Sequence, residues 1–172
     1  GAGDVNGDGY DDVIIGAGKY NNGEMNEGAA FLYLGSPGGL STLSSWQMES
    51  NQASNSSQTN TVSGAGDING DGYADVIVGL SGYDDGVTDN GTAYVYFGSS
   101  TGLTTVASSI RGPFQNNAYF GHSVAGGGDF NGDGLSDIII GSKGYGYDYG
   151  YTNEGAVFAF YGGNSSAFYL QN

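Results

Sequence analysis

Short apolar runs separated by polar, glycine-rich stretches recur three times along this chain. The first run of each repeat is β-branched and three residues long, which is typical of a strand and too short for a helix. These runs are 13–15, 76–78 and 138–140. A longer apolar run follows each of them after a polar connection, and it predicts a further strand at 29–34, 92–97 and 156–161.

Two weaker segments complete each repeat. A segment of small residues lies before the first apolar run at 1–3, 62–66 and 120–128, and a closing segment follows at 43–49, 103–111 and 167–171. Four short strands joined by turns are the pattern of a β-propeller blade. The chain is therefore predicted to be all-β, a single propeller segment of three blades of four antiparallel strands, with boundaries at about 1–49, 50–112 and 113–172. Propellers have about four to eight blades, so this segment is open unless it dimerises or belongs to a longer chain.

A nine-residue motif rich in Asp and Gly lies directly before the first apolar run of each repeat, at 4–12, 67–75 and 129–137. Its leading Asp recurs after 63 and then 62 residues. Positions 1, 3, 5 and 9 carry oxygen-bearing side chains, and glycines at positions 4 and 6 allow a sharp turn. Several oxygens on one small loop are what Ca²⁺ requires, whereas Mg²⁺ usually keeps several waters. We therefore expect three calcium sites.

The ligand set differs from that of an EF-hand, which needs a Glu at position 12. Position 12 is Ile15, Val78 or Ile140 here. The set is therefore expected to close at position 9, with the position 7 carbonyl as a further ligand. The predicted ligands are Asp4, Asn6, Asp8, Tyr10 and Asp12; Asp67, Asn69, Asp71, Tyr73 and Asp75; and Asp129, Asn131, Asp133, Leu135 and Asp137. Turns without an ion are the alternative, but clustered carboxylates without a counterion repel one another.

The charge balance excludes several classes of partner. The chain has 18 acidic residues against three Lys and Arg, a formal charge of −15, which three bound Ca²⁺ would change to −9. Nucleic acid and anionic membranes need clustered basic residues, and no apolar run reaches the length of a membrane helix.

Cysteine is absent, so neither disulfides nor thiolate sites brace the loops. An acidic, cysteine-free chain with calcium sites favours an extracellular setting, secreted or at the cell surface.

These motifs resemble the FG-GAP repeats of integrin α-subunit propellers and of many secreted bacterial and fungal proteins. The name-giving Phe-Gly occurs as Phe120-Gly121, and the Gly-Ala-Pro segment is approximated at 16–18, 79–81 and 141–143. The second repeat departs from the pattern, with Gln58-Thr59 in place of Phe-Gly. The resemblance implies the calcium ligands given above, on loops that join the first and second strands at one face of the propeller. It also implies that the connections between second and third strands lie on the opposite face, where integrin-type relatives bind ligands.

Tyrosines recur on those second connections. Tyr20, Tyr83 and Tyr145 each follow the leading Asp by 16 residues, and the third repeat adds Tyr147, Tyr149 and Tyr151. Aromatic rings near Asp, Asn and Gly can stack on sugars or anchor a protein partner. Packing of the loops between neighbouring blades is the alternative interpretation. The tyrosines are therefore candidate ligand-binding residues.

Three other features are expected to be structural. The Asn-, Ser- and Gln-rich stretch 50–60 is interpreted as a solvated linker, and Trp46 as a packing residue between blades. His122 and Ser123 suggest a catalytic triad, but adjacent strand residues point to opposite faces.

No enzymatic activity is expected, because a catalytic carboxylate pair is normally unique and these loops occur three times. The sequence thus predicts a non-catalytic, calcium-stabilised module for extracellular recognition or adhesion, with a protein or glycan ligand. The alternatives are an accessory domain of a secreted hydrolase or lyase, or a structural half-propeller that forms a six-bladed homodimer.

Overall fold

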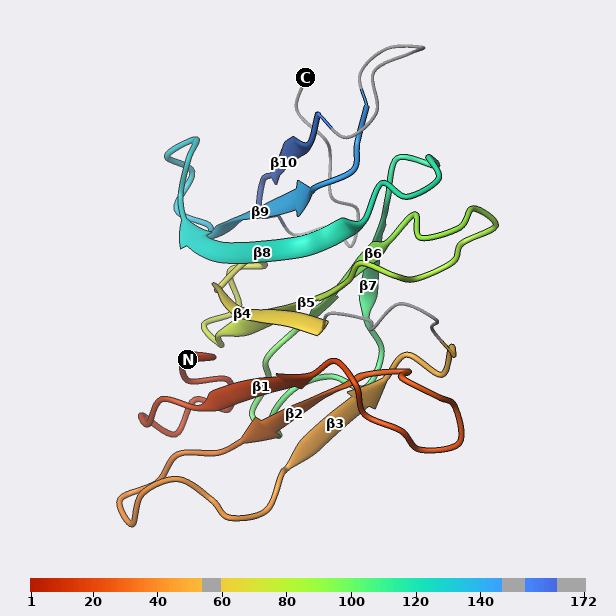
Figure 1. Cartoon of the computed structure of the whole chain (residues 1–172). Coiled ribbons are helices and arrows are strands. Elements are labelled where there is room, and N and C mark those ends of the chain that lie inside the picture. The colour runs from red at the N-terminus through yellow and green to blue at the C-terminus, as the bar shows by residue number, and fades with distance from the viewer. Residues whose placement is uncertain (54–59, 147–153, 164–172) are drawn as a thin grey trace.

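The computed structural model describes residues 1–53, 60–146 and 154–163, and this part of the chain folds into three stacked antiparallel sheets without a helix (Figure 1). Consequently, it contains no helix of the length and apolar character needed to cross a membrane. The strands are β1 (Val13–Ala17), β2 (Ala29–Tyr33), β3 (Trp46–Glu49), β4 (Asn60–Gly66), β5 (Asp75–Leu80), β6 (Thr92–Tyr96), β7 (Ser108–Arg111), β8 (Phe120–Gly128), β9 (Asp137–Ser142) and β10 (Ala156–Phe160).

The three sheets follow the chain in order, and each contains one repeat. Their strand orders are β1-β2-β3, β4-β5-β6-β7 and β10-β9-β8, and we call the sheets with their loops blades 1, 2 and 3. Sequential strands pair as neighbours throughout, as in a meander. The predicted fold class, an open all-β propeller segment, is confirmed.

The strands of the two apolar runs form where the sequence predicts them, but the closing strands begin later than expected. β3 starts at Trp46 rather than at residue 43, and β7 starts at Ser108 rather than at residue 103. The preceding residues are still in a turn, because Ser41 and Thr104 donate their N–H groups back to the end of the previous strand. The third predicted closing segment, 167–171, lies outside the described residues.

Hydrophobic side chains fill the two spaces between the blades. Between blades 1 and 2, Ile14 and Leu32 pack with Val76 and Val78; between blades 2 and 3, residues such as Ile77 pack with the third sheet. Trp46 joins the first core: its ring lies edge-on to Tyr96 at 4.6 Å, and Nε1 donates to the Thr104 carbonyl at 3.1 Å. The interpretation of Trp46 as an inter-blade packing residue is thus confirmed.

The middle blade is buried on both sides, and the outer blades are buried on one. Every residue of β5 is buried. By contrast, Ile15 on β1 is 47% exposed and Val157 on β10 is 73% exposed. The stack therefore ends in two partly apolar faces, one on blade 1 and one on blade 3.

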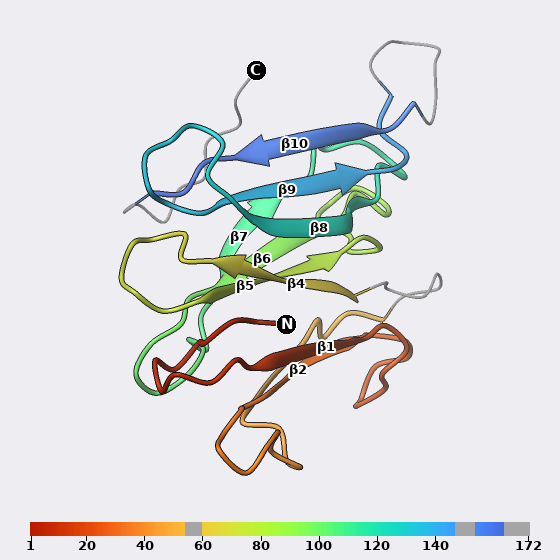
Figure 2. The same cartoon turned by 90° about the vertical axis from the view of Figure 1, so that its left-hand side faces the viewer.

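The aspartate loops and the tyrosine-bearing connections lie at opposite edges of the stack. Residues 67–75 and 129–137 join the first and second strands of their blades at the left edge in Figure 1, and residues 81–91 join the second and third strands at the right edge. The perpendicular view shows the same stacking of the sheets (Figure 2). The arrangement implied by the resemblance is therefore present.

Candidate functional site

The three aspartate loops share one pattern of internal hydrogen bonds. In the first loop, Asp4 Oδ1 accepts the N–H groups of Gly7 at 2.7 Å and Asp8 at 3.1 Å, and Oδ2 accepts that of Gly9 at 2.7 Å. Gly7 and Gly9 have φ angles of 74° and 90°, which glycine adopts without strain. The loop thus turns around its leading carboxylate. Asp67 and Asp129 are held in the same way.

Positions 3 and 5 add oxygens to the same turn. The Asp8 N–H group also lies 3.1 Å from Asn6 Oδ1, and Asn6 Nδ2 donates to Asp8 Oδ2 at 3.0 Å. Oxygens from positions 1 and 3 therefore converge on one backbone nitrogen. The second and third loops repeat these contacts with Asn69 and Asn131.

Position 9 has a structural role that the sequence analysis missed. Asp12 is fully buried, and its Oδ2 accepts the Val5 N–H at 2.9 Å while Oδ1 accepts the Gly35 N–H at 2.8 Å. Asp75 and Asp137 make the equivalent two bonds. This carboxylate ties the aspartate loop to the turn after β2, β6 or β10. Because each carboxylate oxygen has two lone pairs, coordination capacity remains on both oxygens.

The pKa values of these carboxylates shift in opposite directions according to whether the carboxylate is buried or exposed. Burial raises the pKa of Asp75 to about 6, although the N–H groups of Gly98 and Ile68 oppose the shift, and nearby Asp71 and Asp67 raise it further. At the exposed Asp129, the Gly134 N–H is the main cause of a pKa below the usual range. A cation beside these groups would favour their ionised forms.

The donor chemistry fits a hard cation. Among the described residues, no three His, Cys, Asp or Glu side chains gather into a metal-binding group. The predicted set instead combines carboxylates at positions 1 and 5, the position 3 amide, the position 7 carbonyl and the buried position 9 carboxylate. All of these donors are oxygens of the kinds that Ca²⁺ accepts.

Each of the first two aspartate loops also bonds to the next blade. The carbonyl of Asp4 accepts the Ala74 N–H at 3.0 Å, and that of Val5 accepts the Ser99 N–H at 3.1 Å. Blades 2 and 3 repeat the arrangement, with Asp67 accepting from Ser136 and Ile68 from Gly163, both at 2.9 Å. A well-ordered aspartate loop therefore stabilises the interface between one blade and the next. This contact cannot be predicted from residue types, since every residue has a backbone carbonyl.

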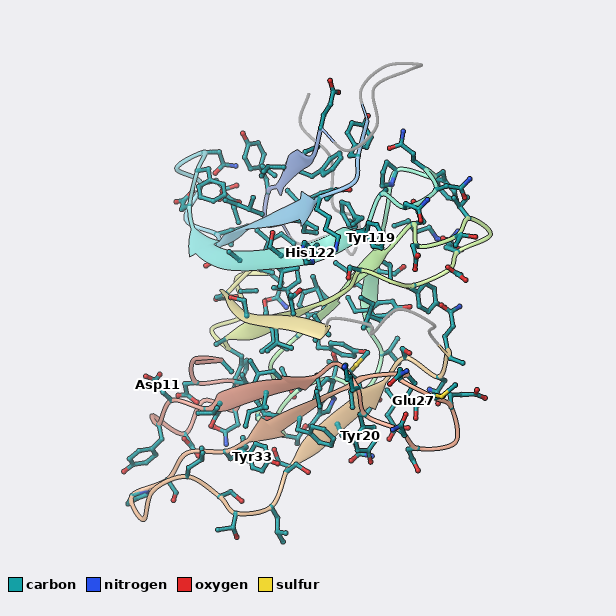
Figure 3. The ribbon with its side chains drawn as sticks, in the orientation of Figure 1. Asp11, Tyr20, Glu27, Tyr33, Tyr119 and His122 are labelled. Carbon is teal, nitrogen blue, oxygen red and sulfur yellow. The ribbon has the colours of Figure 1, made fainter. Side chains whose placement is uncertain are left out.

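At the opposite edge, the recurring tyrosines pack within their own blades. Their rings lie edge-on to an aromatic residue of the following strand: Tyr20 to Phe31 at 5.4 Å, Tyr83 to Tyr94 at 6.4 Å and Tyr145 to Phe158 at 5.6 Å. Figure 3 shows Tyr20 on blade 1, away from the loop end marked by Asp11. These ring contacts are intra-blade, but Tyr83 also packs against the hydrophobic core between blades 1 and 2, as the alternative interpretation expects. Tyr147, Tyr149 and Tyr151 lie outside the described residues.

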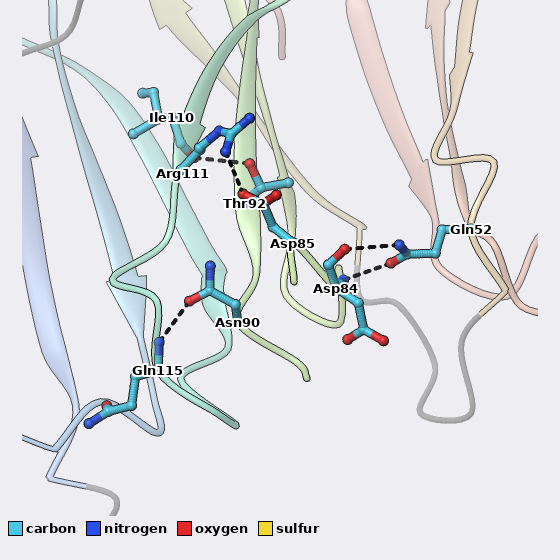
Figure 4. Close-up of polar contacts among 8 residues, drawn as sticks. All are labelled: Gln52, Asp84, Asp85, Asn90, Thr92, Ile110, Arg111 and Gln115. Carbon is cyan, nitrogen blue, oxygen red and sulfur yellow. Dashed lines mark hydrogen bonds and ion pairs between the residues drawn. The ribbon is translucent and has the colours of Figure 1, made fainter. Parts of the chain in front are cut away.

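One of these tyrosines borders a hollow of about 250 Å³ on blade 2. Tyr83 and Tyr94 form its aromatic wall, and Asp85 and Arg111 lie at its polar side, joined by an ion pair of 3.2 Å (Figure 4). Burial, with Tyr83 close by, raises the pKa of Tyr94, so its hydroxyl stays neutral. Aromatic faces beside charged hydrogen-bonding groups suit a sugar or a peptide. The sequence analysis missed Asp85 and Arg111 because they come from different segments.

Two glutamines bond the connections between the sheets to a loop of the sheet that follows. Gln52 Oε1 accepts the Asp84 N–H at 2.7 Å and Nε2 donates to the Asp84 carbonyl at 3.1 Å (Figure 4). Gln115 makes the same pair of bonds with Gly146, at 2.9 and 3.1 Å. Gln52 falls in the stretch 50–60, interpreted above as a solvated linker; residues 54–59 of that stretch lie outside the described residues, but Gln52 itself is anchored by these two bonds. The sequence contains a pattern that could have identified this pair, because each glutamine follows the leading Asp of its repeat by 48 residues.

Replacing either glutamine is expected to weaken the fold measurably. Gln115→Ala leaves the N–H and carbonyl of Gly146 without this partner, so we expect a loss of about 1–2 kcal/mol in the free energy of unfolding, measured in urea. Gln47→Ala is the matched control, since the Gln47 side chain is exposed and its one hydrogen bond among the described residues is to Glu49 of its own strand. Equal losses in the two variants would contradict a stabilising role of the Gln115 bonds.

His122 and Ser123 do not form a triad in the described part of the chain, but the strand that contains them is not regular. A bulge between Phe120 and Ser123 interrupts the strand alternation on which the opposite-face expectation rests, and both residues border one hollow together with Glu154. Within the part of the chain that the structure describes, buried His122 Nδ1 has no hydrogen-bond partner, whereas a triad imidazole is bonded at both nitrogens. Burial and the neighbouring Lys143 lower the pKa of His122, which favours the neutral ring.

Two models of known protein families match this sequence, and the matched residues include the three aspartate loops. An FG-GAP-like repeat matches residues 4–78 and an FG-GAP repeat matches residues 120–160, so the two matches include all three aspartate loops. The chain belongs to the FG-GAP repeat family. Its sequence is similar to human integrin α-6, with 33% identity over 141 residues, and to Drosophila melanogaster integrin α-PS3, with 32% identity over 146 residues. Mouse integrin α-E is 43% identical over 91 residues.

These matches cover different shares of the proteins. The first two span 81% of this FG-GAP chain but 12% of each integrin subunit, and the third spans 45% of the chain and 7% of integrin α-E. The chain therefore corresponds to a small part of these relatives. The similarity supports an integrin-like propeller module of the adhesion and recognition type.

Proposed function

We propose that this chain is a non-catalytic, calcium-stabilised propeller segment for extracellular recognition or adhesion. The main supporting observation is the threefold repetition of one aspartate loop, of which the first two bond to the following blade. A catalytic site would not be repeated at equivalent positions in each blade. The similarity to integrin α subunits supports the adhesion-type role.

Calcium would be held by the side chains at loop positions 1, 3, 5 and 9 and the carbonyl at position 7. In the first loop these are Asp4, Asn6, Asp8 and Asp12 with the Tyr10 carbonyl, and the matching residues serve in the other two loops. The bound ion would neutralise the carboxylates and fix the turn that carries the inter-blade carbonyls. An extracellular location suits this chemistry, because calcium is plentiful there.

The ligand, a protein or a glycan, is proposed to bind at the tyrosine edge. The hollow beside Tyr83 offers two rings, a carboxylate and a guanidinium, and Arg111 is exposed. Aromatic residues and Arg are enriched among the residues that dominate binding energy. The aspartate loops remain structural at the other edge.

Loss of Tyr83 is expected to reduce ligand binding. After a glycan and protein array in calcium identifies a ligand, Tyr83→Ala should weaken its affinity about tenfold or more, and Arg111→Ala should also weaken it. Tyr20→Ala is the control, because Tyr20 makes the same intra-blade contact on blade 1 outside this hollow. A ligand whose affinity falls equally in Tyr20→Ala and Tyr83→Ala would rule out the hollow as its site.

We further propose that two copies join into a six-bladed ring. Ile15 and Val157 lie on the two outward faces, and their counterparts in blade 2, Val78 and Ala93, are completely buried against a neighbour. Light scattering in calcium should give twice the chain mass of 17.5 kDa, and Val157→Asp should give a monomer. Leu43→Asp, in an exposed turn, should leave the dimer intact. A monodisperse monomer of the unmodified chain would exclude the ring.

A further inference from the structure

The three aspartate loops lie one above another along one edge of the stack (Figures 1 and 2). Neighbouring loops touch through the residue at position 7. The ring of Tyr73 in the second loop lies against Gly7 of the first, because a Cβ atom on Gly7 would be 2.7 Å from Tyr73 Cε1. Leu135 in the third loop lies against Gly70 of the second, where a Cβ atom would be 2.9 Å from Leu135 Cδ2. Position 7 of one loop therefore covers position 4 of the loop before it.

The residue at position 8 bonds the same pairs of loops together. The Ala74 N–H donates to the Asp4 carbonyl at 3.0 Å, and the Ser136 N–H donates to the Asp67 carbonyl at 2.9 Å. Asp4 and Asp67 are the leading residues, whose carboxylates hold the turns of their own loops. The leading residue thus has its carboxylate in its own predicted ligand set and its carbonyl bonded to the following loop.

Position 7 also belongs to the predicted ligand set of its own loop. The Tyr73 N–H donates to Asp71 Oδ1 at 3.0 Å, and the Leu135 N–H donates to Asp133 Oδ1 at 2.9 Å. Both residues supply a carbonyl to that set. Because the backbone and the side chain of Tyr73 share one Cα atom, fixing its carbonyl also fixes where its ring lies on the first loop.

The first and last loops each lack one of these contacts. Tyr10, at position 7 of the first loop, is 41% exposed, and the 172 residues contain no earlier aspartate loop for it to cover. A Cβ atom on Gly132, at position 4 of the third loop, would meet nothing within 4 Å among the described residues. Gly7 and Gly132 have φ angles of 74° and 76°. They therefore differ in the contact with a following loop and share the same backbone conformation.

We propose that Tyr73 and Leu135 are positioning residues for the calcium site of the preceding loop, so that neighbouring sites bind calcium cooperatively. This inference rests on the proposed calcium sites and adds a coupling between them. When the Tyr73 carbonyl holds an ion, the ring and the Ala74 N–H are fixed against the first loop and order it for binding. Linkage is reciprocal, so binding in either loop strengthens binding in the other by the same factor.

A calcium titration that resolves the three loops tests this coupling. In proton–nitrogen correlation spectra of the full chain, the amides of Gly9, Gly72 and Gly134 report on one loop each, since each N–H bonds to a leading carboxylate. Tyr73→Ala should weaken binding in the first loop by about fivefold or more. Tyr73→Phe keeps the ring and should bind as the unmodified chain does. Leu135→Ala should weaken binding in the second loop.

Two comparisons separate this coupling from a general loss of structure. Tyr10→Ala makes the same change at position 7 of the first loop, and it should leave the affinities of the second and third loops unchanged. Gly7→Ala should weaken binding in the first loop more than Gly132→Ala weakens it in the third, because only Gly7→Ala presses on a ring. That excess should disappear when Tyr73→Ala is added, as a double-mutant cycle would measure.

The outcomes also separate the coupling from the calcium sites themselves. Calcium binding in all three loops, with unchanged first-loop affinity in Tyr73→Ala, would overturn the coupling and leave the proposed sites standing. The absence of calcium binding in every loop would overturn both.

Discussion

Excess chelator is expected to lower the melting temperature of the protein by about 15 °C or more. Each site at a free calcium concentration of 100 times its dissociation constant would stabilise the folded state by about 2.7 kcal/mol. For a chain of this size, 1 kcal/mol corresponds to about 2–4 °C. Three such sites would therefore produce a large shift, which differential scanning calorimetry in calcium and in chelator measures directly.

A pair of charge-matched variants makes this test specific. Asp8→Asn removes one anionic ligand, so more calcium should be needed to reach the same melting temperature. Asp11→Asn makes the same charge change at an exposed residue outside the ligand set (Figure 3). An unchanged melting curve in chelator, or equal calcium dependence in the two variants, would refute the calcium sites.

Asp75→Asn is expected to cost about 2–5 kcal/mol of the free energy of unfolding, with or without calcium. The Asp75 carboxylate is fully buried and accepts two N–H groups, from Ile68 at 2.8 Å and Gly98 at 2.9 Å. An amide has one oxygen and one NH₂ group, so it would place a donor against a backbone donor. Urea unfolding of the variant and the unmodified chain gives the loss.

Measuring the free energy of unfolding in chelator separates the contribution of the two Asp75 hydrogen bonds from that of metal binding. Asp71→Asn changes an exposed carboxylate at position 5, and its effect should largely disappear once calcium is removed. The effect of Asp75→Asn should persist, because its backbone partners do not depend on the ion. If the two variants were equally stable in chelator, the tie from position 9 to the following turn would be excluded as a major source of stability.

Much of the architecture follows from the sequence pattern. The β-branched runs at 13–15, 76–78 and 138–140 lie in β1, β5 and β9, because short apolar runs bounded by glycine favour strands. The position of the aspartate loops at one edge follows from the antiparallel order of the strands. The repeat thus determines both the fold and where its acidic residues gather.

The remaining features depend on contacts that residue types do not reveal. The buried tie of Asp12 to Gly35 joins two turns through a backbone N–H group. The side chain of Gln52 also binds backbone atoms, in a loop of the sheet that follows. The bulge that places His122 and Ser123 at one hollow interrupts an otherwise regular strand. Each of these features depends on the folded arrangement of the backbone, which the residue types along the chain do not specify.

The inter-blade hydrogen bonds described above also give the stack a direction. Ala74 and Ser99 of blade 2 donate to carbonyls of blade 1, and Ser136 and Gly163 of blade 3 donate to carbonyls of blade 2. In these loop contacts each blade therefore offers N–H donors to the blade before it and carbonyl acceptors to the blade after it. Blades can be added only head to tail, so the number of repeats can change by duplication without any new type of interface.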